Sequence, residues 1–389
     1  MIKKKIAILG STGSIGKTLI NIIKKDKKDF EIVLLAADGN YKELLKQAKY
    51  FKVKNLIITN QDSFLKIKKD KYAKNIQIFN NFNNFKKIFK KKIDYTMSSI
   101  MGIQGLRPTI DIIKYSKKIA IANKESIICG WDLIEKNLKK YKTQFIPVDS
   151  EHFSIWYALR DTDKNLIDKI YITASGGPFL KTPLDKLKKA NIKQATNHPN
   201  WEMGKKISID SATMMNKVFE IIEAKKIFNI SYKKLSILIH PKSYIHAIIK
   251  FKNGLTKIVI HETDMMIPII NSLYSFSKEI SSKKLDIKIL NNLKLKEINY
   301  KRFPAAKILQ LLPEKSSSFE NILVSTNDKL VDLFLNKKIK FTDIQKILFK
   351  IINSNEAKKL KSKRLKNVKE IINLNEIVNS KINKIVYKM

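Results

Sequence analysis

The chain has 389 residues, 44% of them hydrophobic, and a formal net charge of +42. This length exceeds one ordinary hydrophobic core, so we expect two or three domains. No run of about 18 or more apolar residues occurs, which argues against a membrane-spanning helix. The strand-like residues that closely follow Met1 leave no room for a signal peptide, and the single Cys129 excludes an internal disulfide. Both observations favour a cytoplasmic protein.

The positive charge resides almost wholly in lysine. Only four of the 77 basic residues are arginine, and lysine is spread through every segment. Specific recognition of bases and phosphates favours arginine. We therefore expect solvated lysine faces and no specific nucleic-acid partner, although the charge would attract anionic small molecules.

The first part of the chain alternates strand-like and helix-like segments. We expect strands at residues 6–9, 31–37, 55–59, 76–79, 94–99 and 118–122, with helices at 17–25 and 42–50 among them. Such alternation predicts a parallel sheet with right-handed crossovers.

A glycine-rich loop, Gly10-Ser11-Thr12-Gly13-Ser14-Ile15-Gly16, directly follows the first strand and opens the first helix. Glycines at this place permit a tight turn, close approach of the backbone to a pyrophosphate and close helix packing. The helix N-terminus then offers free N–H donors to the phosphates. The loop predicts a Rossmann-type dinucleotide-binding domain; the alternative is a plain strand–turn–helix.

The second strand ends at Asp38-Gly39-Asn40, the position that contacts the adenosine ribose of the coenzyme in such domains. An acid here bonds the 2′-hydroxyl of NADH, whereas the 2′-phosphate of NADPH needs a cation. Asp38 argues for NADH, and Lys42 with the general positive charge argues against it. The residues leave the coenzyme open.

Two acids follow the strand-like stretch that ends near Pro147. In an extended backbone Asp149 and Glu151 would share one face, since residues i and i+2 point the same way. Carboxylates held that close call for a cation between them, either a metal ion or a substrate ammonium. The alternative is a strand end whose acids face water. His152 is expected to support the pair from the opposite strand face.

Further along, strands are expected at 170–174, 235–240 and 245–251, with helices at 183–189 and 212–228. Ser211 would begin the latter helix, where a hydroxyl and free N–H groups can hold a phosphate. Asn216, Lys217 and Glu220 form a polar side of that helix. Glu220 would be a third hard oxygen ligand suited to Mg²⁺ or Mn²⁺, with Glu223 as the competing candidate.

His198 and Trp201 lie in a loop-like stretch that ends at Gly204. An exposed Trp201 could form a lid over a bound ligand or be a packing anchor. The histidines in or beside strands are expected to be structural; they are His240, His246 and His261. Beyond Tyr300 the strands end, and helices are expected at 305–312, 326–336 and 342–352.

Several compact motifs are similar to those of the 1-deoxy-D-xylulose 5-phosphate reductoisomerase family. They are the loop at Gly10–Gly16, A-N-K-E-S at 122–126, V-D-S-E-H at 148–152, A-S-G-G-P-F at 174–179, H-P-N-W-E-M-G-K-K at 198–206 and D-S-A-T-M-M-N-K at 210–217. The resemblance covers essentially the whole chain in the same order. A nicotinamide dehydrogenase of the semialdehyde or homoserine type is the alternative, but it would give no reason for V-D-S-E-H at 148–152 to occur together with the S-A-T-M-M-N-K helix at 211–217.

The resemblance implies an α/β protein with an NADPH-binding Rossmann-type domain at 1–148, a central α+β catalytic domain with a mobile lid at 149–290, and a C-terminal linker and helical domain at 291–389. It implies isomerisation of 1-deoxy-D-xylulose 5-phosphate and NADPH-dependent reduction to 2-C-methyl-D-erythritol 4-phosphate, by a homodimer. At the ribose position the family usually has a small residue followed by a variable, often basic one, so Asp38-Gly39 departs from its pattern.

The resemblance also assigns site residues. It selects Glu220 over Glu223 as the third metal ligand and gives Lys124 a catalytic role at the hydroxyl and carbonyl end of the substrate. The substrate would further contact Ser150, Glu151, Ser175, His198, Trp201, Ser211, Asn216, Lys217 and Glu220. The coenzyme would contact Thr12, Gly13, Ser14, Ile15, Asp38, Gly39, Asn40, Asn123, Glu125 and Gly204.

Overall fold

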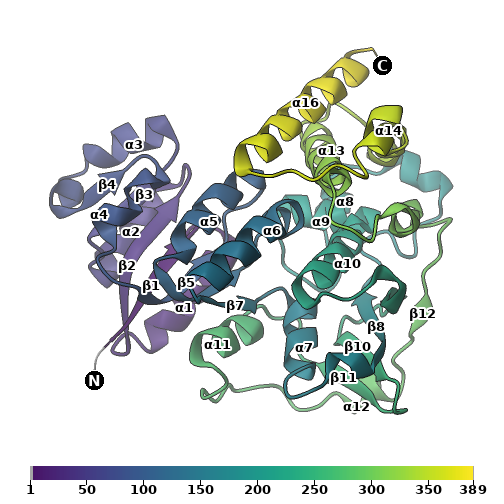
Figure 1. The fold of residues 1–389 in the computed structure, drawn as a ribbon, viewed down its shortest axis with the longest axis horizontal. Coiled ribbons are helices and arrows are strands. Elements are labelled where there is room, and N and C mark those ends of the chain that lie inside the picture. Colours follow the sequence, from purple (N-terminus) through teal and green to yellow (C-terminus); the bar gives the residue numbers. More distant parts are fainter. Residues whose placement is uncertain (1–2, 389) are drawn as a thin grey trace. The chain divides into compact units, whose positions relative to one another are not determined.

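The computed structural model describes residues 3–388, which divide into two compact units (Figure 1). The first unit contains the residues up to Asp149 together with Met265–Ile280, and the second contains Ser150–Asp264 and the residues from Ser281 onward. The division after Asp149 lies one residue from the expected one. The return of Met265–Ile280 to the first unit was not foreseen, because those residues were expected in the central domain.

The first unit is built on a seven-stranded parallel sheet with the order β4-β3-β2-β1-β5-β6-β7. Its strands are β1 (Lys4–Leu9), β2 (Phe30–Ala37), β3 (Asn55–Ile58), β4 (Gln77–Phe79), β5 (Ile93–Ser98), β6 (Ser116–Ile121) and β7 (Gln144–Pro147). The predicted parallel sheet is confirmed. The strand order reverses between β1 and β5, which creates the crevice where open α/β sheets bind ligands.

Helices connect these strands. They are α1 (Ser14–Lys25), α2 (Tyr41–Phe51), α3 (Gln61–Lys68), α4 (Phe85–Ile88), α5 (Leu106–Ile113), α6 (Lys124–Lys140) and, from the returning segment, α11 (Met266–Tyr274). Short 3-10 turns lie at Lys71–Asn75, Phe82–Asn84 and Ile103–Gly105. The strands are nearly continuous apolar runs because helices cover the sheet (Figure 1).

Helix α11 completes the core of this unit. Ile269 is fully buried, and Leu273 and Tyr274 are nearly so, in one cluster with residues of β1, β2 and α1. The ring of Tyr274 meets Phe30 edge to face at 5.5 Å, and its hydroxyl donates to Asp26. The segment is therefore a structural part of the first unit.

The second unit contains a five-stranded mixed sheet with the order β11-β10-β8-β9-β12. Its strands are β8 (Ile167–Ala174), β9 (Leu235–Ile239), β10 (Ile245–Phe251), β11 (Thr256–Ile260) and β12 (Lys296–Glu297). Only β8 and β9 pair in parallel, and the other neighbours are antiparallel. The predicted second sheet is confirmed.

The helices of the second unit fall into those around the sheet and those that end the chain. The former are α7 (Ser150–Ala158), α8 (Ile192–Thr196), α9 (Lys205–Thr213), α10 (Met215–Phe228) and α12 (Ile287–Leu290). The latter are α13 (Ser318–Leu335), α14 (Phe341–Ile352), α15 (Asn355–Lys359) and α16 (Val368–Tyr387). Further 3-10 turns lie at Lys164–Leu166, Asp185–Lys189, Tyr232–Lys234 and Pro304–Leu311.

Two segments that were expected to be α-helices are 3-10 turns in the structure. Residues 183–189 and 305–312 form 3-10 turns rather than α-helices, at Asp185–Lys189 and Pro304–Leu311. Pro183 and Pro304 supply no N–H, which favours a short turn at each place. The helix expected at 342–352 is confirmed as α14, whereas the one expected at 326–336 begins earlier, at Ser318, as α13. All regular elements after Tyr300 within residues 3–388 are helical.

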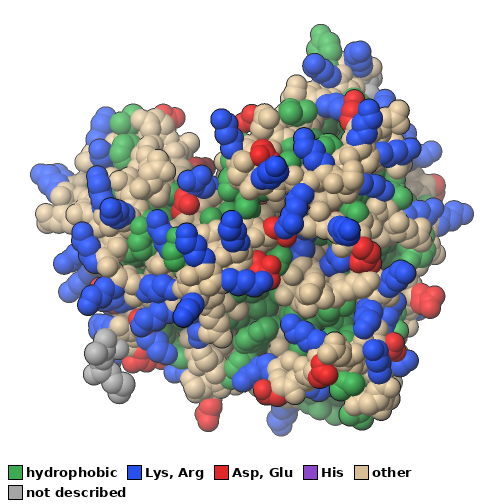
Figure 2. All heavy atoms as spheres, in the orientation of Figure 1, with side chains coloured by type: hydrophobic (Ala, Val, Ile, Leu, Met, Phe, Trp, Pro, Cys, Tyr) green, Lys and Arg blue, Asp and Glu red, His purple; other side chains and the backbone are tan. Residues whose placement is uncertain are grey.

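Lysine and arginine side chains are scattered over the visible face among other residue types (Figure 2). They do not gather there into one continuous stripe of the kind that follows a nucleic-acid backbone. Within residues 3–388 no helix combines the length and apolarity needed to cross a membrane.

Candidate functional site

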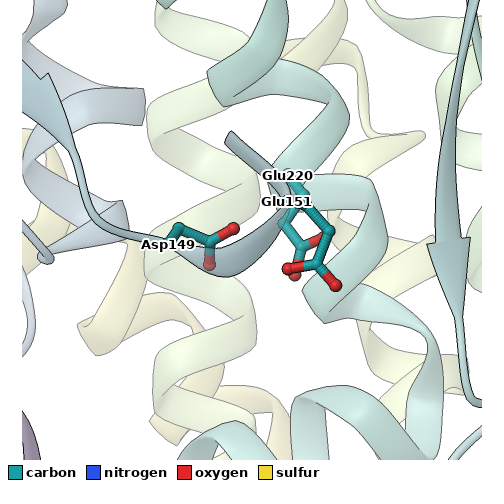
Figure 3. A group of neighbouring side chains, drawn as sticks. All are labelled: Asp149, Glu151 and Glu220. Carbon is teal, nitrogen blue, oxygen red and sulfur yellow. The ribbon is translucent and has the colours of Figure 1, made fainter. Parts of the chain in front are cut away.

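Three carboxylates come together in the structure. Ligand oxygens of Asp149, Glu151 and Glu220 all lie within 4.8 Å of one another (Figure 3). Glu151 and Glu220 are buried and Asp149 is half-buried. Buried like charges this close repel strongly, so the arrangement requires cations. Three hard oxygen donors fit Mg²⁺ or Mn²⁺, which prefer carboxylates to the nitrogen and sulfur ligands of zinc.

The two acids near Pro147 reach this arrangement by a route different from the expected one. Strand β7 ends at Pro147, and Glu151 lies in the first turn of α7. The prediction that alternation along a strand places Asp149 and Glu151 on one face was wrong. Proline cannot continue the hydrogen-bonded ladder, and the chain turns into a helix. This strand-to-helix turn brings the acids together.

Lysines neutralise the carboxylates. The Nζ atom of Lys124, at the start of α6, lies 2.5 Å from Asp149 Oδ2. The Nζ atom of Lys217 lies 2.5 Å from Glu151 Oε1 and 2.7 Å from Glu220 Oε2. Buried charges survive only when paired and hydrogen-bonded in this way. The ammonium groups of Lys124 and Lys217 therefore already neutralise part of the negative charge of the three carboxylates.

The polar side predicted for α10 is confirmed. Asn216 Nδ2 donates to Glu220 Oε1 at 2.5 Å, and Lys217 reaches the other oxygen of the same carboxylate. Among the side chains of residues 3–388, Asn216 Oδ1 is one of the buried oxygens that accept no hydrogen bond. These residues are one and four positions apart on one helix face, as the sequence indicates.

The expected single helix at 212–228 is interrupted. Met214 has a φ of 70° and separates α9 from α10, so Ser211 lies near the C-terminal end of α9 and not at a helix start. The phosphate argument for Ser211 was wrong in that respect. Asn216 and Lys217 instead occupy the first turn of α10, where helix N-termini favour anions. Ser211 lies beside Gly177, whose hypothetical Cβ would be 2.8 Å from its carbonyl oxygen.

Ser175 and His198 form a polar pair next to this turn. The Nδ1 atom of His198 accepts from the backbone N–H groups of Asn200 and Trp201, at 3.2 and 3.0 Å. The proton of the neutral ring is thereby assigned to Nε2, which donates to Ser175 Oγ at 2.9 Å. Ser175 Oγ also accepts from Gly177 N–H at 3.0 Å, so its hydroxyl hydrogen can be donated to a ligand.

Burial, and secondarily the positive charge of Lys217, lowers the pKa of His198 to about 4. The ring is therefore neutral near pH 7, consistent with the acceptor role of Nδ1. A neutral His198 fixes the Ser175 hydroxyl as a donor, which suits an anion such as a phosphate.

Trp201 lies in the loop between α8 and α9 and is half-buried. Its ring packs edge to face on His246 at 6.0 Å, and His246 stacks on His261 at 3.7 Å. The Nδ1 atom of His246 is 4.0 Å from Glu151 Oε1. Trp201 thus packs against His246, and His246 in turn lies next to Glu151 of the carboxylate group. Gly204 ends the loop as the exposed N-cap of α9.

His152 and Glu223 settle where the two acids of α10 point. The Nε2 atom of His152 donates to the backbone carbonyl of Glu220 at 2.8 Å, from α7 rather than from a strand face. The Oε2 atom of Glu223 is 3.9 Å from His152 Nδ1 and is not in the carboxylate group. Ser150 donates its hydroxyl to Glu151 Oε2 at 2.5 Å. Glu220 is therefore the acid that the structure places with Asp149 and Glu151.

Sequence reasoning missed two contacts of the site. His246 and His261 were expected to be purely structural, yet they connect Trp201 with Glu151. Asn327, on the terminal helix α13, was not a candidate at all, yet its Nδ2 donates at 2.7 Å to Oδ1 of Asp210 on α9. Neither contact leaves a local signal, because each joins residues distant in sequence.

The glycine loop that was predicted to bind phosphates lies in the first unit. Gly13 is the N-cap of α1, and Gly13 and Ser14 are exposed while Thr12 and Ile15 are half-buried. A Cβ at Gly16 would lie 2.3 Å from the carbonyl oxygen of Gly10, and Gly10 itself has a φ of 86°. The loop lies at the carboxyl end of β1, beside the switch point with β5. Both glycines are required by the backbone.

The other predicted coenzyme residues are placed at neighbouring strand ends. Asp38, Gly39 and Asn40 are exposed after β2; Asp38 Oδ1 accepts from the Thr59 hydroxyl at 2.6 Å, and Asn40 caps α2. Asn123 is buried and caps α6, while its Nδ2 donates to the carbonyls of residues 100 and 102. Glu125 is buried in the first turn of α6. Asn123 therefore caps α6 with Oδ1, which accepts from the Ser126 N–H group, while Nδ2 serves the loop after β5.

Comparison with known proteins gives a consistent result. Residues 6–130 match the family described as 1-deoxy-D-xylulose 5-phosphate reductoisomerase, residues 145–228 its C-terminal domain, and residues 260–380 the DXP reductoisomerase C-terminal domain. The reductoisomerase of Pelagibacter ubique is 60% identical over 97% of this chain and 98% of its own length. That of Wolbachia pipientis wMel is 39% identical over 89% of each chain.

Solved structures agree over the whole chain. The Zymomonas mobilis reductoisomerase in complex with NADPH is 29% identical, covers 99% of this chain and 98% of its own, and has a TM-score of 0.86. A reductoisomerase in complex with NADPH, fosmidomycin and magnesium has a TM-score of 0.90 at the same identity and coverage. The fold, the carboxylate group and these relatives together show that the chain belongs to the 1-deoxy-D-xylulose 5-phosphate reductoisomerase family.

Proposed function

We propose that this chain converts 1-deoxy-D-xylulose 5-phosphate into 2-C-methyl-D-erythritol 4-phosphate, by metal-dependent isomerisation followed by NADPH-dependent reduction. This is the second step of non-mevalonate isoprenoid precursor biosynthesis. The observation that carries the proposal is the group of Asp149, Glu151 and Glu220, whose third member lies on α10 together with Asn216 and Lys217. Family membership supports it, because the named relatives share both halves of the chain.

Asp149, Glu151 and Glu220 would hold Mg²⁺ or Mn²⁺. A divalent cation bound there supplies Lewis-acid stabilisation of negative charge that develops on the ketone and neighbouring hydroxyl oxygens of the substrate. Lys124, hydrogen-bonded to Asp149, would orient the hydroxyl and carbonyl end of the substrate. Ser150 would position Glu151 through its hydroxyl.

The phosphate of the substrate would be bound by Ser175, Ser211, Asn216, Lys217 and His198. Ser175 offers its hydroxyl hydrogen, since His198 and Gly177 donate to its oxygen. Asn216 and Lys217 would bind the phosphate from the first turn of α10, where the helix N-terminus favours an anion. Binding of this remote group would hold the reacting carbons in place while Trp201 and its loop exclude water as a mobile lid.

NADPH would bind the glycine loop at Thr12, Gly13, Ser14 and Ile15 and supply the hydride for the reduction. Asp38, Gly39 and Asn40 would meet the ribose, and Asn123, Glu125 and Gly204 would lie toward the nicotinamide. NADPH is proposed over NADH because a relative of the same fold binds it and the general charge favours a second phosphate. The carboxylate of Asp38 already has a partner in Thr59, which weakens its case as a ribose ligand for NADH.

We further propose that residues 1–148, 149–290 and 291–389 act as coenzyme-binding, catalytic and helical segments, except that Met265–Ile280 serves as a structural part of the first unit. The protein would act in the cytoplasm as a homodimer and accept manganese as well as magnesium. A single cysteine suits the reducing compartment, and the family expectation supports the dimer.

The deciding experiment is an assay of the full chain with 1-deoxy-D-xylulose 5-phosphate and Mn²⁺, run with NADPH and then with NADH. Glu151→Gln should lower kcat by about 100-fold or more while leaving the dissociation constant for NADPH unchanged, because one charged metal ligand is lost. The exposed Glu297→Gln is the matched control and should behave like the unaltered chain. Near-normal turnover by Glu151→Gln would contradict the metal assignment, and higher kcat/KM with NADH would contradict the coenzyme assignment.

A further inference from the structure

We propose that Lys217 is a charge switch that couples binding of the divalent cation to binding of the substrate phosphate. Its ammonium neutralises Glu151 and Glu220, is displaced by the cation, and then pairs with the phosphate. The proposal rests on the proposed function, because it uses the same metal and substrate. It adds an energetic link between two ligands that the site would otherwise bind separately.

The first support is the position of the ammonium between the two acids. Lys217 Nζ lies 2.5 Å from Glu151 Oε1 and 2.7 Å from Glu220 Oε2, and these contacts come from one side chain. The side chain of Glu220 is 1% exposed and that of Lys217 is 11% exposed. Water cannot screen such a triad effectively, so the ammonium is a principal source of neutralisation for both carboxylates.

The second support is competition for oxygens. Mg²⁺ binds carboxylate oxygens at about 2.0–2.1 Å and Mn²⁺ prefers the same ligands. An ammonium at hydrogen-bond distance from oxygens of both Glu151 and Glu220 would face a divalent ion across a few ångströms. The two cations repel each other and compete for the same lone pairs. Binding the metal therefore requires Lys217 to move.

The third support is the surroundings into which Lys217 can move. Burial, and after it the positive charge of Lys217, lowers the pKa of His198, so the ammonium acts electrostatically on the ring that holds Ser175. It also belongs to the first turn of α10, whose N-terminus favours an anion. A phosphate there would provide the negative charge that the ammonium gives up at the carboxylates.

Coupling of this kind is reciprocal. If the cation releases Lys217 toward the phosphate site, phosphate must tighten cation binding by the same factor by which the cation tightens phosphate binding. Couplings between protein sites are typically about 5- to 150-fold. Removal of the ammonium should therefore relieve the competition at the carboxylates and abolish the mutual enhancement.

The test measures Mn²⁺ affinity of the full chain by electron paramagnetic resonance, without coenzyme or turnover, in the absence and presence of inorganic phosphate. We expect phosphate to tighten Mn²⁺ binding to the unaltered chain by about 5-fold or more. Lys217→Met should bind Mn²⁺ more tightly than the unaltered chain without phosphate, and phosphate should no longer change its affinity. Lys217→Gln repeats the test if the methionine variant does not fold.

Two variants separate this proposal from the metal assignment. Lys225 lies on the same helix and pairs with Glu314 at 2.7 Å, away from the carboxylate group. The variant Lys225→Met should bind Mn²⁺ with the affinity of the unaltered chain, with and without phosphate. Comparison with it in one buffer also cancels association of Mn²⁺ with free phosphate. Glu220→Gln should lose Mn²⁺ binding; if it does and Lys217→Met binds no more tightly than the unaltered chain, the switch is overturned while the metal site stands. If the unaltered chain binds no Mn²⁺, both proposals fail.

Discussion

At the scale of single residues, the site depends on hydrogen bonds that fix which atom donates. His198 illustrates this, because two backbone N–H groups donate to its Nδ1 and leave Nε2 to hold Ser175. His152 holds the backbone of Glu220 in a similar way. Residue types alone could indicate that these polar side chains are candidates for the site. They could not give the tautomer of His198, because it is set by Asn200 and Trp201 in the folded loop.

The lowered pKa of His198 predicts a pH dependence of stability. The ring titrates at about 4 in the folded chain and at about 6.5 when unfolded, so between these values the unfolded state binds more protons. Stability should therefore fall as the pH decreases through this window. His198→Gln removes the group, and its melting temperature should fall less between pH 6.5 and 4. Both melting temperatures are measured by circular dichroism. Equal slopes for the two proteins would show that folding does not lower the pKa of His198.

At the scale of elements, the sequence was informative where local chemistry decides the structure. The glycine loop between β1 and α1 and the polar side of α10 both follow from spacing and were confirmed. The breaks at Pro147 and Met214 were not foreseen. Met214 adopts a positive φ while its side chain is 1% exposed in the core, so packing across the unit and not local preference places the break.

The close packing of the glycine loop gives a prediction for α1. Gly16→Ala would place a methyl group 2.3 Å from the Gly10 carbonyl oxygen, and neither backbone segment can move without disturbing the loop. We expect a loss of stability of about 1–3 kcal/mol and weaker NADPH binding. Chemical denaturation and fluorescence titration measure the two effects. Thr18→Ala, on the same helix, should retain NADPH affinity; unchanged affinity in Gly16→Ala would contradict a close approach of the coenzyme.

At the scale of the whole molecule, the net charge of +42 comes from lysines in every part of the sequence and should oppose folding through self-repulsion. Added salt screens charges beyond about 10 Å at 0.1 M. The melting temperature should consequently rise between about 0.01 and 0.3 M KCl, in the range where screening changes most. An uncharged osmolyte at equal osmolality serves as the control. A melting temperature that is constant or falls with salt would show that ion pairs outweigh the repulsion.

The return of Met265–Ile280 to the first unit has a consequence for synthesis of the protein. Because α11 supplies Ile269, Leu273 and Tyr274 to the core beside β1 and α1, that core stays incomplete until the ribosome has translated past residue 280. The nascent chain must therefore produce Ser150–Asp264 before the core of the first unit can be completed. A protein truncated at Asp149 would expose an apolar face to chaperones, and the two units must mature together rather than in order of translation.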